Sequence, residues 1–154
     1  MSKKRLAKGL LAVAALSTLI IPIVTDAVFL TNAHMNNPAW LPHAKLHCAM
    51  SFFAAASLGL AALAILKVRP VSDRFSMGLA AFLGSAFWIG LIASGLLPGT
   101  SYGFLNDPVL GNVTAPQVGG ISIYPNVMAA VVTIAIALAG YWFANQAESA
   151  NQYR

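Results

Sequence analysis

The three histidines of the chain lie close together. His34, His43 and His47 fall within the stretch HMNNPAWLPHAKLH, and Asp26 precedes it by a few residues. Imidazole and carboxylate groups are ligands of zinc, iron and copper. The same groups move protons near neutral pH, because the charge of histidine changes there. The stretch therefore indicates either a metal site or acid/base chemistry.

The spacing of these residues predicts how they meet. His43 and His47 are four residues apart and share one face of a helix that begins near Pro42, a residue favoured at the first helical position. Asp26 lies in an apolar segment, where an acidic side chain is costly and points to function. We expect Asp26, His34, His43 and His47 to converge, either as a catalytic group or as ligands of one zinc, iron or copper ion.

The remaining reactive residues set limits on that site. The other acids are Asp73, Asp107 and Glu148, which do not provide the carboxylates of a di-iron centre, so a mononuclear site is the most that the ligands support. The single cysteine, Cys48, excludes an internal disulfide and a cysteine-rich metal site, and its apolar surroundings favour inert packing.

A structural role for the same stretch is the alternative. Histidine, tryptophan and asparagine are frequent at membrane interfaces, where half-wet rings anchor a chain. In the enzyme interpretation Asn32, Asn37 and Trp40 would shape the site. In the structural interpretation the same residues would be an interfacial anchor and a helix cap.

The composition predicts the elements that must position these residues. Of 154 residues, 58% are hydrophobic and 8% are charged, whereas soluble domains carry about 25% charged residues. Four apolar segments reach the roughly 20 residues that a bilayer requires: approximately 9–30, 44–66, 75–97 and 124–144. We predict an all-α fold, a single integral membrane domain over 1–154 that forms a four-helix bundle.

The charges predict the orientation. Eight of the nine basic residues fall on one side of the spans, and Lys45 falls on the other. By the positive-inside tendency both termini are cytoplasmic and the histidine stretch is periplasmic in a bacterial inner membrane. The net charge of +5 therefore reflects basic residues on the cytoplasmic side of the membrane. We expect the lipid bilayer as a partner and no nucleic-acid partner. A cleaved signal peptide over Lys3–Ala27 is the alternative, but the apolar run continues to Leu30.

The two outer connections, 31–43 and 98–123, are long, and the inner one is short. We therefore expect the functional site on the outer side of the membrane. Within the second loop, Asp107-Pro108 is typical of a turn.

Small residues at four-residue spacing predict where the helices pack closely: Ala55 and Gly59 in the second span, Ala86, Gly90 and Ser94 in the third, and Ala129, Thr133 and Ala137 in the fourth.

The histidine stretch also resembles a family. The order Asp26, Asn32, His34, then Asn37-Pro38-x-Trp40-x-Pro42-His43-Ala44-Lys45-x-His47 is similar to the hallmark of a family of small four-span membrane proteins from fungi and bacteria. Leu46 and Ala33 depart from that hallmark, where an aromatic residue and a threonine are more usual. The resemblance implies the four-span fold and the same four candidate residues, and it implies no particular reaction.

We therefore expect a membrane enzyme that acts on a lipophilic small molecule by metal-assisted or acid/base chemistry. The alternative is a non-catalytic membrane subunit or ligand-binding protein, within a homo- or hetero-oligomer, whose histidine stretch contacts a partner. Exposure discriminates between the two: His34 and Trp40 should face the bundle in an enzyme and face away from it in a subunit.

Overall fold

The computed structural model describes residues 2–104, 111 and 114–152, with side chains up to residue 147. Its main elements are four long helices: α1 (Lys3–Ile23), α2 (Pro42–Val68), α3 (Arg74–Ser94) and α4 (Pro125–Gln152). All four are long and apolar enough to cross a membrane. The four predicted spans are confirmed as helices, although the first begins six residues earlier and the fourth ends eight residues later than predicted. Asp107-Pro108 and Arg154 lie outside the described residues.

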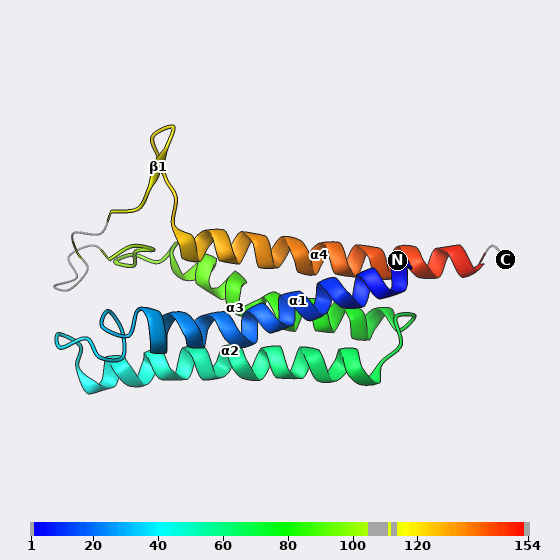
Figure 1. Ribbon diagram of the computed structural model, residues 1–154, viewed down its shortest axis with the longest axis horizontal. Helices are drawn as coiled ribbons and strands as arrows, with labels where there is room; N and C mark the ends of the chain where they lie inside the picture. The colour runs from blue at the N-terminus through cyan, green and yellow to red at the C-terminus, as the bar shows by residue number, and fades with distance from the viewer. Residues whose placement is uncertain (1, 105–110, 112–113, 153–154) are drawn as a thin grey trace.

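The helices run alternately up and down, so both termini and the short α2–α3 connection lie at one end (Figure 1). We call this the terminal end, and the opposite end, which carries both long loops, the loop end. At the terminal end the Lys8 ammonium donates to the Leu66 carbonyl at 2.7 Å, which satisfies a free carbonyl in the last turn of α2. Asp73 caps α3 by accepting hydrogen bonds from the backbone N–H and the hydroxyl of Ser76.

Helix α1 lies against all three other helices. A Cβ added at Gly59 of α2 would lie 2.6 Å from the Ala15 carbonyl oxygen, and one at Gly140 of α4 would lie 2.9 Å from Leu11. Gly84 of α3 also contacts the backbone of Ala15. Glycine allows this close backbone approach where lipid offers no hydrophobic drive to packing. These contacts make α1 a structural part of the bundle.

The small-residue stripes are confirmed in two of the three spans. Ala55 and Gly59 are buried in α2. In α4 Thr133 and Ala137 are buried and Ala129 is half-buried. In α3 the prediction is wrong, because Gly90 and Ser94 are exposed. The buried face of α3 instead carries Ala80, Ala81, Gly84, Ser85 and Trp88, since its contact with α1 is centred on Gly84.

The outward faces of the helices are apolar. Large side chains such as Phe53, Phe82, Leu138 and Trp142 are more than half exposed. In water such a surface would be unstable, but lipid tails solvate it. The exposure pattern therefore fits a multi-pass membrane protein.

Beyond Ile23 the first helix changes its winding. Val24–Phe29 form a π-helical segment, η1, in which the Leu30 N–H donates to the Thr25 carbonyl five residues back. Pro22 precedes the change and has no N–H to give to the regular α-helical ladder. The Thr25 hydroxyl lies 2.9 Å from the Ile21 carbonyl and 3.2 Å from that of Pro22. The predicted first span is thus one continuous helix with a π turn at its loop end.

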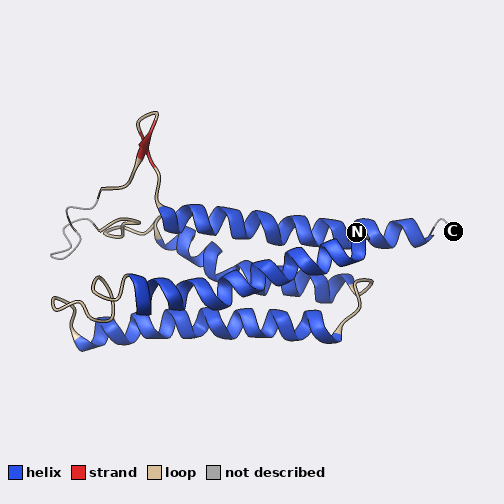
Figure 2. Ribbon diagram, in the orientation of Figure 1, coloured by secondary structure: helices blue, strands red, loops and turns tan. Residues whose placement is uncertain are grey.

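The second long loop contains a small hairpin that projects from the bundle (Figure 2). Strands β1 (Gln117–Val118) and β2 (Ile121–Ser122) pair antiparallel. Gly119 and Gly120 join them with φ of 59° and 81°, the conformation that a two-residue hairpin turn requires. The beginning of this loop, up to Phe104, returns to the bundle and covers a cavity.

Candidate active site

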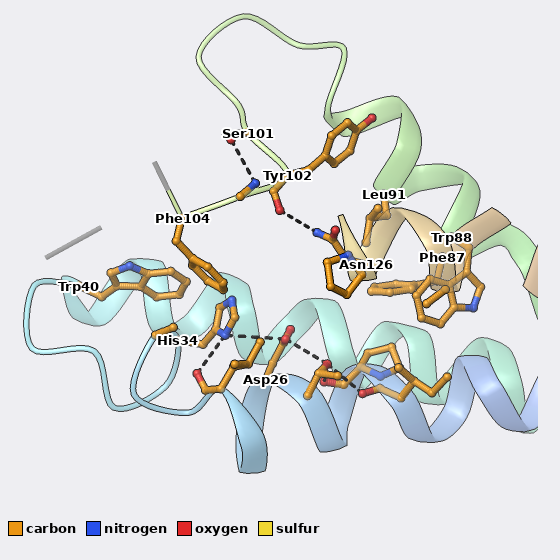
Figure 3. A pocket seen from close by; sticks show the side chains of 18 residues that line it. Asp26, His34, Trp40, Phe87, Trp88, Leu91, Ser101, Tyr102, Phe104 and Asn126 are labelled. Carbon is orange, nitrogen blue, oxygen red and sulfur yellow. Dashed lines mark hydrogen bonds and ion pairs between the residues drawn. The ribbon is translucent and has the colours of Figure 1, made fainter. Parts of the chain in front are cut away.

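A cavity of about 700 Å³ lies at the loop end of the bundle. Its walls come from the end of α1, η1, α3 and the start of α4, and the two long loops cover it (Figure 3). Most of the lining is apolar, with aromatic side chains prominent: Trp40, Phe87, Trp88, Tyr102 and Phe104. Small-molecule sites typically have this size and this predominance of apolar walls with few polar groups.

Asp26 and His34 face each other in the wall of this cavity. The Nδ1 atom of His34 lies 3.8 Å from the Asp26 Oδ1 atom, and the side chains are 20% and 24% exposed. The same Nδ1 atom lies 3.1 Å from the Leu30 carbonyl oxygen. A carbonyl accepts hydrogen bonds and donates none, so Nδ1 carries the proton and Nε2 is the free base in neutral His34.

This arrangement suits proton transfer at Nε2. In Figure 3 that nitrogen points away from Asp26 and toward Phe104. When Nε2 accepts a proton, the ring becomes a cation, which the Asp26 carboxylate stabilises from 3.8 Å. The attraction is stronger in a partly buried site than in water, because the local dielectric is lower. Asp26 therefore places a carboxylate beside the His34 ring.

Local structure fixes both side chains. Asp26 lies on η1, and the Thr25 hydroxyl is 3.2 Å from its Oδ1 atom. π turns in long helices are frequent at functional sites. His34 lies in the following loop, with its ring edge-on to Trp40 at 5.5 Å and to Phe104 at 6.0 Å. Aromatic contacts therefore hold the ring on two sides.

The predicted shaping residues take different places. Asn37 is fully buried, donates to the Ala33 carbonyl and accepts from the Ala39 N–H, so it fixes the turn that carries His34. Trp40 lines the cavity. Asn32 is exposed and is not among the residues that line the cavity.

The polar lining also includes two residues, Asn126 and Tyr102, that the sequence analysis did not select. Asn126, in the first turn of α4, donates from Nδ2 to the Tyr102 carbonyl at 3.0 Å. The Tyr102 hydroxyl donates to the Ile92 carbonyl at 2.7 Å, which ties the loop to α3. The sequence signal for Asn126 was its place directly after Pro125, a pair typical of a helix start.

Trp88 has two roles in the structure. It lines the cavity and is only 2% exposed. Its indole Nε1 donates to the Thr18 hydroxyl at 2.8 Å, and that hydroxyl donates to the Gly84 carbonyl at 2.6 Å. The cavity floor is thus joined to α1 by a buried hydrogen-bonded chain.

His43 and His47 form a second, separate pair. Their Nε2 atoms are 3.0 Å apart, both residues are exposed, and neither lines the cavity. The predicted α2 start at Pro42 and the shared helical face are confirmed. The expected convergence of all four residues is wrong, because the buried face of α2 runs along Phe52, Ala55 and Gly59 and the histidine face turns outward.

The chain therefore offers two pairs where one group was expected. Among the residues that the structure describes, no three histidine, cysteine, aspartate or glutamate side chains come together as metal ligands. The exposed pair alone could contribute two ligands. With nitrogen–metal distances of about 2.1 Å, a 3.0 Å separation corresponds to an angle of about 90° at the metal, which suits tetragonal copper or nickel better than tetrahedral zinc.

A comparison of the chain with protein-family models, curated proteins and solved structures found no match. The fold and the candidate site therefore rest on the residues and contacts described above.

Proposed function

We propose that this protein is a small integral membrane enzyme that moves a proton on a lipophilic small molecule. The observation that carries the proposal is the Asp26–His34 pair in the wall of an otherwise largely apolar cavity. A cavity with such walls favours an apolar substrate, and a base with a carboxylate counter-charge favours proton abstraction.

In the proposed reaction the Nε2 atom of His34 removes a proton from the bound substrate. Asp26 and the Leu30 carbonyl stabilise the imidazolium, and Nε2 then returns the proton to the same or another substrate atom. The Asn126 and Tyr102 side of the cavity provides polar contacts for the substrate. Such a positioned base contributes about 10²- to 10⁴-fold in rate.

The membrane placement belongs to the same proposal. Seven basic residues lie in or next to the terminal end of the helices, from Lys3 to Lys8 and from Lys67 to Arg74, whereas Lys45 lies at the loop end. The positive-inside tendency supports cytoplasmic termini and a periplasmic cavity in a bacterial inner membrane. A fluorescent-protein fusion at the C-terminus should fluoresce, and an alkaline phosphatase fusion there should be inactive. An active phosphatase fusion at that position contradicts this orientation.

The alternative is a non-catalytic subunit or ligand-binding protein, and outward-facing His34 and Trp40 would have excluded the enzyme. Both residues line the cavity instead, which is compatible with the enzyme and counts against a subunit that uses them to contact a partner. The exposed His43–His47 pair is the feature that still suits a contact with a partner.

Deuterium transfer tests the proposal for any lipophilic substrate whose proton the protein exchanges with water. The protein, in lipid nanodiscs, is incubated in heavy water with an apolar lipid extract of a bacterial membrane, and mass spectrometry follows the deuterium content of each species. We expect at least one species to gain deuterium with wild-type protein. His34→Gln and Asp26→Asn should slow that gain by about 10²-fold or more.

His43→Gln is the matched control, because it makes the same change in an exposed histidine at the same end of the bundle. It should leave the exchange unchanged. If no species differs between wild type and His34→Gln, the proton-transfer proposal is wrong. A species that copurifies with both proteins would then indicate binding without catalysis.

A further inference from the structure

A second hollow adjoins the cavity on the side of α2 and α3. Its volume is about 440 Å³, and it shares Asp26, Phe87, Leu91, Tyr102 and Asn126, among others, with the first cavity. The hollow also reaches Ser51 on α2 and the end of α3. Asp26 thus lies in the wall of both spaces, which are adjacent and share several side chains.

The mouth of this hollow is formed by small side chains. Ser51 of α2 and Gly90 and Ser94 of α3 are all exposed there. A Cβ added at Gly90 would meet nothing within 4 Å, whereas one at Gly59 or Gly84 would meet the backbone of α1. The small residues of α3 that the sequence assigned to helix packing instead leave a gap between two neighbouring helices.

The surroundings of the mouth are apolar and exposed. On α2 the exposed Met50 is next to Ser51, and on α3 the exposed Ile89 is next to Gly90. The exposed His47 lies one turn before Ser51 on the same face of α2. Large exposed apolar side chains on a membrane-spanning helix face lipid tails. The gap therefore lies between apolar side chains that suit acyl chains and the more polar loop end of the bundle.

We propose that the gap between α2 and α3 is a lateral portal through which an amphiphile with a long apolar chain reaches Asp26 from the bilayer. This inference rests on the proposed function and adds the substrate class and its route. The polar end of the ligand enters past Ser51, Gly90 and Ser94, and its chain stays in the portal. The hydroxyls at the mouth pair with the polar end as it passes.

Tryptophan quenching tests the portal independently of catalysis. Trp40 and Trp88 line the cavity, and the remaining tryptophan, Trp142, is 55% exposed on α4. In a Trp142→Phe background, emission reports on the cavity. The probe is a long-chain alcohol that carries bromine, an effective contact quencher, added to protein in nanodiscs of unbrominated lipid. We expect saturable quenching.

Gly90→Leu should fill the portal and weaken the saturable quenching at least tenfold, because its side chain enters open space and leaves the helix contacts intact. Gly9→Leu is the matched control. Gly9 is exposed, its Cβ would also meet nothing within 4 Å, and it lies at the terminal end. Circular dichroism and gel filtration should show both variants folded. Equal quenching of the two variants overturns the portal.

The two proposals can fail separately. Saturable quenching that depends on Gly90, in a protein that transfers no deuterium, leaves the portal standing and removes the enzyme. Deuterium transfer that depends on His34, with quenching indifferent to Gly90→Leu, leaves the enzyme standing and shows that its ligand enters elsewhere, through the loops.

Discussion

Replacing Thr18 by valine removes the hydroxyl that joins α1 to the cavity floor while keeping the shape of the side chain. That hydroxyl accepts from the Trp88 indole at 2.8 Å and donates to the Gly84 carbonyl at 2.6 Å. Thr18 and Trp88 are both buried. Thr18→Val therefore breaks two interhelical hydrogen bonds and leaves the indole N–H without this partner.

The size of the effect follows from these contacts. Interhelical hydrogen bonds in membrane proteins average about 0.6 kcal/mol and reach about 1.7 kcal/mol. An unsatisfied buried donor costs about 1–3 kcal/mol. We expect Thr18→Val to lower the free energy of unfolding by about 2–3 kcal/mol. Thr18→Ser keeps the hydroxyl and loses one methyl group, at a cost of about 1 kcal/mol or less.

The assay is reversible unfolding in mixed micelles, followed by circular dichroism during a titration with a denaturing detergent. A double-mutant cycle with Trp88→Phe isolates the coupling between the two side chains, which we expect to be about 1 kcal/mol. The reasoning is refuted if Thr18→Val unfolds within about 0.5 kcal/mol of wild type, or if Thr18→Ser costs as much as Thr18→Val.

Three further predictions concern other parts of the bundle. Gly59→Ala should lower the free energy of unfolding by about 1–3 kcal/mol, because its Cβ would lie 2.6 Å from the backbone of α1. Gly90→Ala should be neutral or slightly stabilising. Similar unfolding free energies for the two variants contradict the packing. The hydroxyl and then the N–H of Ser76 hold the pKa of Asp73 below its usual 3.8, so the stability from this cap is fully present above the usual pKa and is lost as the pH falls through the lowered one. Asp73→Asn should remove that part of the acid dependence of unfolding, and an unchanged pH profile refutes the cap. The exposed histidine pair should bind one Cu²⁺ ion with two nitrogen ligands. His47→Ala should weaken that binding at least tenfold in a calorimetric titration. A variant that binds copper as wild type does shows that the ion is held elsewhere.

The spans were predictable because twenty-residue apolar runs have few other structures available to them. The start of α2 at Pro42 was also predictable, from the preference of proline for a first turn. The π turn of η1 was not, because an apolar sequence with a proline fits either a regular or a wider helix. The contact of Trp88 with Thr18 depends on how helices far apart in sequence rotate against each other, which no local pattern determines.

The outward direction of the exposed histidine pair was within reach of the sequence. The buried positions of α2 are Phe52, Ala55, Gly59, Ala62 and Leu66. At 100° per residue, His47 lies about 100° and His43 about 140° from the centre of that stripe. The shared face of the pair was a sound inference from the spacing. A comparison of that face with the stripe of small residues that contacts α1 predicts that the histidines face away from the bundle.

The wide turn of η1 determines what a change in chain length would do to the protein. Deleting one residue within Val24–Phe29 would let the helix close as a regular α-helix as far as Leu30. A π turn holds one residue more than an α turn, so the chain beyond Leu30 would keep nearly the same direction. The widened backbone that carries Asp26 opposite His34 would be lost. Evolution can alter the aromatic walls of this cavity one side chain at a time, but the length of these six residues is not free to drift.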